Sequence, residues 1–334
     1  MLNKKNEKVY GLLGIESKMA NWNADFSGFA RTTGDGTVFG TDKAIKYGIR
    51  NYWNQNEDNK LLCFKEYMEV FPENKKDKEV LGSYLQPMTL LEKYKKDFNV
   101  IESLKKLNQT DILVNLLSYT DVKNFGITFA VDECNLSITG PVQFGHGFDI
   151  MGDVEQVQMQ ITSPFRNSND KSKGNMATTI GNQTVTKEAH YLYSVIVNPL
   201  AYQKEMEHLK NKKDIDESLL YYTKEDYAKL KGAMLLSATS LDSCAKKGAN
   251  NEFALFLETE NDTYLPDLSC YVKFKKEDKN IYEINFEGLL EDLGKSLKTI
   301  EIFYNNASVE IKGDVLASIK TKIYNIFTQK EIVR

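Results

Sequence analysis

The chain has 334 residues, of which 41% are hydrophobic and 27% are charged. This composition is typical of globular proteins with a hydrophobic core and excludes an intrinsically disordered chain. The length fits one large domain or two modest ones, and it excludes a small disulfide-stapled scaffold. The 43 basic and 47 acidic residues give a net charge of −4, so any binding site for a polyanion must be local.

The cysteines and the hydropathy of the chain indicate the cellular compartment in which the protein resides. The four cysteines form no C-x-x-C pair, and none lies close enough to a histidine to suggest a zinc site. The N-terminal segment is polar, and no run approaches the roughly 18 apolar residues that span a bilayer. We expect a cytoplasmic protein, neither secreted nor membrane-embedded, with free thiols at Cys63, Cys134, Cys244 and Cys270.

The first expected elements are a strand, a loop and a helix. Residues 9–15 read VYGLLGI, an apolar run with β-branched and aromatic residues that predicts a buried strand. Residues 21–41 carry four glycines among Asn, Asp, Ser and Thr, which predicts a long polar loop. Either Thr41 or Asp42 can cap the following helix, which we expect to run through about Trp53.

The middle of the chain changes from helices to strands. Residues 55–120 are rich in lysine and glutamate, with helical periodicity at 80–94 and 100–117, which predicts an inserted, mostly helical lobe. A polar stretch at 163–186 is too long for an ordinary hairpin turn, and loops of this length are commonly functional or disordered. The expected strands around it are 126–131, 135–144, 154–162 and 190–197.

The last third mixes helices and strands without βαβ regularity, which predicts an α+β fold with a mainly antiparallel sheet. The expected helices are 224–238, 286–297 and an amphipathic C-terminal helix at 314–327. The expected strands are 253–258, 270–275, 300–303 and 309–311.

One candidate site is the loop and helix at 31–50. Three of its basic residues recur at helical spacings of three and four, so they share one helix face, and a fourth precedes them in the loop. Against Asp35 and Asp42 they leave a local excess of +2, which suits phosphate. The alternative is a solvated basic helix face. The four residues are Arg31, Lys43, Lys46 and Arg50.

A second candidate is the stretch 163–186. Arg166, Lys171 and Lys173 precede Met176 there, and a mobile hairpin of this composition can straddle a nucleic-acid strand and insert Met176 between bases. The alternative is a disordered surface loop.

Enzyme signatures are mostly missing. The sequence has no Walker loop, no G-x-G-x-x-G, no G-x-S-x-G and no H-E-x-x-H. His190 is expected to pack within its strand, whereas His146 lies between glycines and can either meet a ligand or form a turn. Asp25 and Asp35 can assist phosphodiester cleavage or cap turns. These residues keep a metal-dependent ribonuclease open as an alternative.

The same regions carry a family resemblance. NWNADFSGFARTTGDGTVFGTDKAIKYGIRNY (21–52), DVKNFGITFA (121–130) and NLSITGPVQFGHGFDI (135–150) together resemble the multicopy backbone subunit of type I CRISPR effector complexes, closest to the subtype I-B form. VQMQITSPFRN and HYLYSVIVNP fit it as well, so the resemblance covers most of the chain in order.

The resemblance implies a fold and a division of the chain. It implies an RRM-like, ferredoxin-like palm with an antiparallel sheet, an inserted helical finger lobe and a β-hairpin thumb. The palm would be discontinuous, formed by 1–54 and 121–334. The finger lobe would be 55–120 and the thumb 163–186, within the palm.

The resemblance also implies a function. Copies stack head to tail along one guide RNA, and exposed guide segments pair with target DNA in antiviral defence. The implied protein partners are a handle-capping subunit, a guide-processing endonuclease and a large subunit. The subunit does not cut and needs no cofactor or metal. Related type III subunits cleave target RNA with a loop aspartate, but the closer similarity to type I argues against cleavage. A scaffold that binds protein alone is a third interpretation.

Carried over by position, the resemblance implies three groups of RNA-binding residues. The guide's backbone would run along Arg31, Thr32, Thr41, Lys43, Lys46 and Arg50. The same groove would be lined by Gln143 and His146. The thumb would contribute Arg166, Lys171, Lys173 and Met176.

Overall fold

The computed structural model describes residues 3–56, 59–71, 82–166, 178–202, 206–207, 209 and 215–332. The chain divides into two compact units, each built from three segments. Unit 1 comprises 1–6, 53–143 and 198–230. Unit 2 comprises 7–52, 144–197 and 231–334. Helices α1 (Asp42–Asn56) and α6 (Lys224–Leu236) and strand β7 (Val142–Phe144) run through the boundaries between the units.

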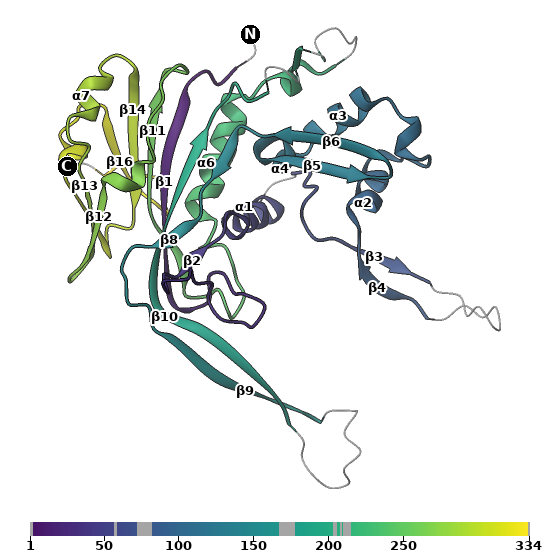
Figure 1. The fold of residues 1–334 in the computed structure, drawn as a ribbon, viewed down its shortest axis with the longest axis horizontal. Coiled ribbons are helices and arrows are strands. Elements are labelled where there is room, and N and C mark those ends of the chain that lie inside the picture. The colour runs from purple at the N-terminus through teal and green to yellow at the C-terminus, as the bar shows by residue number, and fades with distance from the viewer. Residues whose placement is uncertain are drawn as a thin grey trace. The chain divides into compact units, whose positions relative to one another are not determined.

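Unit 2 is organised around the nine-stranded sheet, in which seven strands follow the order β16-β14-β11-β1-β10-β8-β2 (Figure 1). The other two, β7 and β9 (Gln156–Arg166), each pair with β10. The strand predicted at 9–15 is confirmed as the inner part of β1 (Lys8–Ala20), which pairs antiparallel with β10 and β11. Apolar residues on both sides of β1 make this central position favourable, because both of its faces are covered. The other strands are β2 (Phe39–Gly40), β8 (Gly147–Asp149), β10 (Thr178–Val197), β11 (Ala249–Thr259), β14 (Leu297–Tyr304) and β16 (Thr321–Asn325).

A smaller sheet packs against one face of the large one. It consists of β12 (Val272–Lys276), β13 (Asn280–Ile284) and β15 (Val309–Lys312). Leu12 and Leu255 of the large sheet share a fully buried cluster with Tyr282 of the small one. Burying a leucine of this kind stabilises the fold by about 1.5–3 kcal/mol. The predicted α+β fold with a mainly antiparallel sheet is confirmed.

One predicted helix in this region is wrong, and another is shorter than expected. The C-terminal helix at 314–327 is instead a 3-10 turn, Asp314–Leu316, followed by β16. Its apolar residues find partners on β14, since Ile323 pairs with Ile302 and the Tyr324 ring stacks on that of Phe303. Long-range pairing therefore overrides the helical period.

The helix predicted at 286–297 shrinks to α7 (Leu289–Leu293). It is bounded by Gly288 and Gly294, whose φ angles are 88° and 48°. Glycine adopts positive φ angles readily, and such a residue at each end interrupts the helical backbone.

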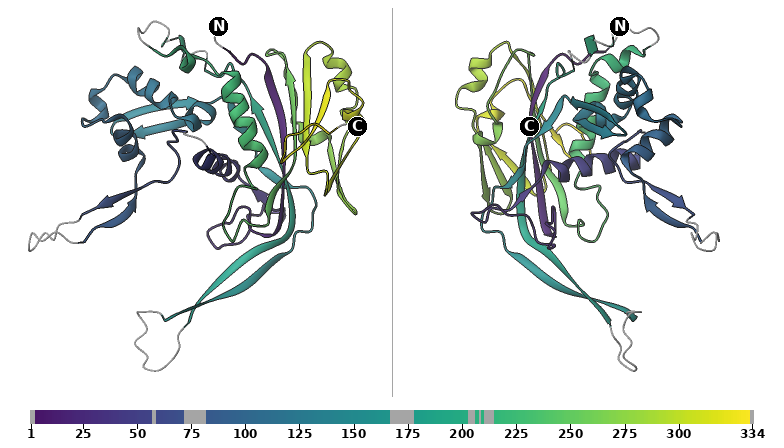
Figure 2. Two further views of the ribbon diagram at one scale, coloured as in Figure 1. Left: turned by 180° about the vertical axis from the view of Figure 1, so that it is seen from behind. Right: turned by 45° about the vertical axis from the view of Figure 1, so that its right-hand side comes forward.

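Strands β9 (Gln156–Arg166) and β10 form a long antiparallel hairpin that extends beyond the rest of the unit 2 sheet (Figures 1 and 2). The polar stretch 163–186 is predicted as a loop, but strand structure continues to Arg166 and resumes at Thr178. Alternating polar and apolar residues of the two strands support this pairing. Lys171, Lys173 and Met176 lie outside the described residues, and so does the side chain of Arg166.

Unit 1 has its own core. Tyr94, Leu116 and Phe129 are fully buried there, and they come from the helices and the hairpin of the unit. The predicted helix at 80–94 begins only after Pro87, at the Thr89 cap, because residues 84–87 form a strand. The elements of the unit are β3 (Tyr67–Val70), β4 (Tyr84–Pro87), α2 (Leu90–Phe98), α3 (Gln109–Leu117), α4 (Thr120–Phe125), β5 (Gly126–Val131) and β6 (Cys134–Thr139). None of the helices in the described ranges is long and apolar enough to cross a membrane.

Candidate nucleic-acid interface

The polar loop 21–41 is folded by its own side chains. One oxygen of Asp25 accepts hydrogen bonds from the amides of Ser27 and Phe29, at 2.8 and 3.0 Å. Asp35 accepts from the Thr33 hydroxyl and from the Thr37 amide, the latter at 3.2 Å. These hydrogen bonds lower the pKa of the Asp35 carboxyl. The turn roles of Asp25 and Asp35 are confirmed. Short polar side chains thus fix the shape of these turns.

Helix α1 begins where this loop ends, and Thr41 caps it. The Thr41 hydroxyl accepts from the Ala44 amide at 3.3 Å, while the Asn23 side-chain oxygen accepts from both the amide and the hydroxyl of Thr41 at 2.9 Å. The next amide, that of Asp42, donates to Nδ1 of His146 at 3.3 Å. The first turn of the helix is thereby held against the loop and against the segment that follows β7.

Close packing behind the loop fixes its position. Trp22 Nε1 donates to the buried Tyr193 hydroxyl at 2.6 Å. A side chain at Gly40 would overlap that hydroxyl and would lie 2.6 Å from Trp22 Nε1. Glycine is therefore required there by the approach of two buried rings. Ile45 and Ile49 of α1 are fully buried.

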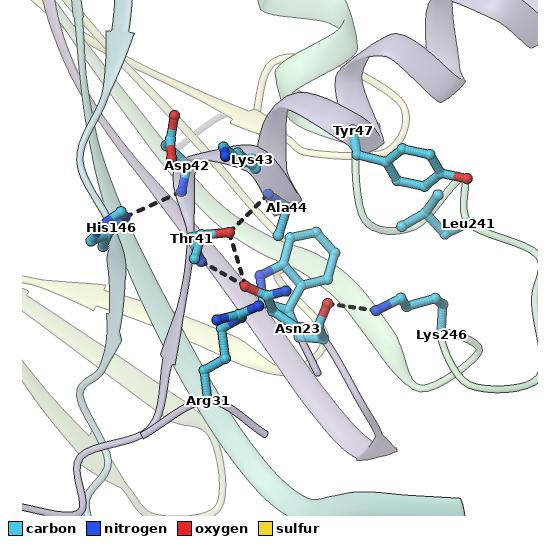
Figure 3. Close-up of a pocket in the computed structure, with 11 residues that line it drawn as sticks. Asn23, Arg31, Thr41, Asp42, Lys43, Ala44, Tyr47, His146, Leu241 and Lys246 are labelled. Carbon is cyan, nitrogen blue, oxygen red and sulfur yellow. Dashed lines mark hydrogen bonds between the residues drawn. The ribbon is translucent and has the colours of Figure 1, made fainter. Parts of the chain in front are cut away.

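These elements enclose a pocket of about 520 Å³ within unit 2, which we call the cationic pocket (Figure 3). Three of its lining side chains are cationic and one is a carboxylate, which gives a formal charge of +3 − 1 = +2. The carboxylate, Asp42, is bonded to Lys46 Nζ at 3.1 Å. The lining residues are Trp22, Asn23, Arg31, Thr41, Asp42, Lys43, Ala44, Tyr47, His146, Leu241 and Lys246.

Lys246 is the most constrained cation of the pocket. Its ammonium donates to the carbonyls of Asn21 and Trp22 at 2.6 and 2.5 Å, and it lies 5.8 Å from the centre of the Trp22 ring. Burial lowers the pKa of Lys246 to about 8, so the group still carries its charge at neutral pH. The two carbonyls carry no formal charge to balance it, so an anion entering the pocket would be favoured.

Arg31 supplies a second cation that is held in place (Figure 3). Its backbone amide donates to the Asn23 carbonyl at 3.2 Å, and its carbonyl accepts from Phe39 at 2.9 Å. Its Nε atom is buried and has no hydrogen-bond partner in the part of the chain that the structure describes. A buried donor without an acceptor is costly, and an anionic oxygen in the pocket would relieve that cost.

The structure brings together four of the residues expected to bind RNA. Arg31, Thr41, Lys43 and His146 all line the cationic pocket. Sequence reasoning missed Asn23, Trp22, Tyr47 and Lys246. Asn23 could have been found, because it lies in the polar loop that the sequence already marks as a candidate site. Nothing in the local sequence marks Lys246 as a partner of Asn21, which lies 225 positions away.

The remaining expected residues lie elsewhere. Lys46 and Arg50 follow on α1 but do not line the pocket, and the side chain of Lys46 is only 14% exposed in its ion pair with Asp42. Thr32 is exposed on the loop. Gln143 belongs to unit 1, where its side chain donates to the Gly140 carbonyl at 2.9 Å.

A second charged cluster, which we call the His190 network, is buried between the two sheets of unit 2. Glu16, His190 and Glu252 bring ligand-type atoms within 4.8 Å of one another. The buried members are already engaged: His190 Nδ1 lies 2.6 Å from Glu252, whose carboxylate also accepts from Tyr282 at 2.7 Å and Asn280 at 2.8 Å. This arrangement fits a hydrogen-bonded core, and the expected packing of His190 within its strand is confirmed.

The same network includes Glu188 and its cations. Burial lowers the pKa of His190, but the hydrogen bond and charge of Glu252, with the hydrogen bond to Glu188, outweigh it and raise the pKa above its ordinary value. Burial raises the pKa of Glu188, but hydrogen bonds from Lys276 and His190 and the charge of Lys18 lower it to about 2. The network therefore pairs its positive and negative charges internally.

Comparison with known proteins places the chain in a family. The family model described as CRISPR-associated protein Cas7 matches residues 7–287. A solved structure titled "CRISPR RNA-guided surveillance complex, pre-nicking" is 11% identical with a TM-score of 0.47, covering 95% of this chain and 96% of its own. Another, titled "CRISPR RNA-guided surveillance complex", is 10% identical with a TM-score of 0.47 and covers 89% and 88%. No curated protein matches the chain. The extent of the family match confirms the resemblance seen in the sequence: the chain belongs to the CRISPR-associated protein Cas7 family.

Proposed function

We propose that the chain binds CRISPR guide RNA through its ribose-phosphate backbone as the repeating subunit of a type I-B surveillance complex. It would present guide segments for pairing with target DNA in antiviral defence. The observation that carries this proposal is the cationic pocket, which a Cas7-family chain of net charge −4 builds from its polar loop and the start of α1.

The chemistry of the pocket suits phosphate better than it suits a base. Arg31 is held in place by its backbone hydrogen bonds and Lys246 by two backbone carbonyls, and their fixed positive charges attract a phosphate. Guide sequences vary, so the protein must bind without reading bases and leave recognition to base pairing. A few such contacts per copy are sufficient, because many copies on one strand multiply their modest affinities.

The proposal extends to the parts and partners of the complex. Residues 1–54 and 121–334 would form the RRM-like palm, 55–120 the finger lobe and 163–186 the thumb. Copies of the chain would stack head to tail in the cytoplasm, together with a handle-capping subunit, a guide-processing endonuclease and a large subunit. Further contacts to the guide would come from Thr32, Lys46, Arg50, Gln143, Arg166, Lys171, Lys173 and Met176.

We infer that the subunit does not cut RNA. The loop carboxylates that a ribonuclease would use, Asp25 and Asp35, accept hydrogen bonds from turn amides. Incubation of the protein with labelled RNA and magnesium should leave the strand intact. Fragments that disappear in the Asp25→Asn or Asp35→Asn variant would support the ribonuclease instead.

The binding proposal is tested by salt dependence. Arg31→Ala combined with Lys43→Ala should weaken binding of single-stranded RNA similarly for unrelated sequences. The slope of log affinity against log salt should fall by about 0.7 for each phosphate that the protein no longer neutralises. The matched control combines Lys295→Ala with Lys312→Ala, two exposed lysines outside the pocket, and removes the same charge. Equal losses of affinity in both double variants would contradict a localised site.

A further inference from the structure

The tip of the polar loop displays an aromatic side chain to solvent. Phe26 is fully exposed and Phe29, at the other end of the same turn, is 40% exposed. Single exposed apolar residues are common on protein surfaces. Phe26 differs from a scattered surface residue in the way that the surrounding chain holds it.

The turn that carries Phe26 is closed by hydrogen bonds on both sides. The Asp25 amide donates to the Phe29 carbonyl at 2.7 Å, and the Asp25 side chain accepts from the amides of Ser27 and Phe29. Gly28, with a φ of 86°, closes the turn and donates to the Asp25 carbonyl at 3.2 Å. The exposure of Phe26 is therefore built into an ordered turn.

The turn is also anchored to the rest of unit 2. The side-chain amide of Asn21 donates to the Gly28 carbonyl at 2.9 Å and to the Thr184 carbonyl of β10 at 3.0 Å. The Ala30 amide donates to the Gln156 side chain of β9 at 2.9 Å. These bonds fix the turn that carries Phe26 with respect to the base of the β9–β10 hairpin, at little further entropic cost when a ligand binds.

The same loop connects this ring to the cationic pocket. Asn23 and Arg31 lie opposite each other, two residues outside the Asp25–Phe29 pair on either strand of the loop. The Arg31 backbone amide donates to the Asn23 carbonyl. Phe26 follows Asn23 by three residues, so the two lie within roughly 10 Å along the chain. A cationic site beside an ordered aromatic ring is the combination with which proteins hold single-stranded nucleic acids, phosphate on one and base on the other.

We propose that Phe26 is a stacking platform for one base of the RNA strand whose phosphates occupy the cationic pocket. This inference rests on the proposed function, and it adds a contact that is made to a base face and is indifferent to base identity. Stacking of this kind weakens binding by roughly fivefold or more per base when the ring is replaced by alanine.

The experiment compares two single strands with the full-length protein freed of nucleic acid. One is an oligouridylate, and the other is an abasic ribose-phosphate strand of the same length. Phe26→Ala and Phe26→Leu should each weaken binding of the oligouridylate at least about fivefold, whereas Phe26→Trp should preserve it. All three variants should bind the abasic strand as the wild type does. Tyr264→Ala, which removes another exposed aromatic ring, is the matched control.

A spectroscopic measurement reports the stacking directly. The chain has two tryptophans, Trp22 and Trp53, which are 1% and 0% exposed. Phe26→Trp would add an exposed fluorophore, and its emission should be quenched by the oligouridylate and not by the abasic strand.

The outcomes separate the two proposals. If the wild type binds neither strand, the proposed function fails. If it binds both strands and Phe26→Ala is without effect, or weakens both equally, the stacking inference alone is wrong. If Phe26→Leu behaves as the wild type while Phe26→Ala reduces self-association, the ring docks on a second copy of the chain and stacking is likewise overturned.

Discussion

Unit 2 gathers charged side chains in two places, and the two are built on opposite principles. In the His190 network, Glu252 meets a histidine, a tyrosine and an asparagine, and Glu188 meets two lysines. In the cationic pocket, three lining cations share one carboxylate, which is itself bonded to Lys46. A network that satisfies its own charges stabilises the fold, while a pocket with excess cations is completed by a ligand.

The largest effect is expected from breaking the His190 network. Glu252→Ala would leave the Tyr282 hydroxyl, the Asn280 amide and His190 without their buried acceptor. We expect the free energy of unfolding, measured by urea denaturation, to fall by about 3–5 kcal/mol. Glu310→Ala, at a side chain that is 49% exposed, should change it by less than about 0.5 kcal/mol.

The comparison also predicts what Glu252→Ala leaves unchanged. Because Glu252 is not among the residues that line the pocket, the folded fraction should bind RNA with the affinity of the wild type. A loss of affinity without a loss of stability would contradict the separation between the two clusters.

An intermediate effect is expected from disturbing the close packing behind the polar loop. Gly40→Ala would place a methyl group against the buried Tyr193 hydroxyl and Trp22 Nε1. Overpacking of this kind costs about 1–3 kcal/mol, so the melting temperature should fall and RNA binding should weaken with it. Gly34→Ala lies in the same loop with nothing within 4 Å of the added atom, and it should leave both unchanged. Equal behaviour of the two variants would show that the Trp22–Tyr193 contact does not position the loop.

The smallest effect is expected on RNA affinity when the pH changes the charge of Lys246. Burial lowers the pKa of Lys246 to about 8, so the ammonium is charged at pH 7 and loses its proton as the pH rises to about 9. The affinity for an oligoadenylate, whose phosphates keep their charge, should fall by up to about tenfold over that range, the value of one charge-assisted hydrogen bond. Lys246→Met should bind more weakly at neutral pH and lose most of this dependence. An identical pH profile in the variant would exclude Lys246 from the anion site.

Local sequence signals predicted the parts of the site that local chemistry builds. The Thr41 cap, the turn roles of Asp25 and Asp35, and the strand at the start of β1 all depend on neighbours within a few residues. Local signals failed at 314–327. The spacing of apolar residues there predicts a helix, but residues 321–325 form β16 and pair with β14.

The polar loop, its turns, the capped helix and the family of the chain could all be inferred from the order of the amino acids. Which charges are paired across the fold and which face a pocket emerged only from the folded chain: His190 lies against Glu252, and Lys246 against carbonyls 225 and 224 positions away. The physical reason is that caps and turns are set by bonds between near neighbours. The surroundings of a charge depend on which distant strands and loops fold beside it, and these carry no local mark in the chain.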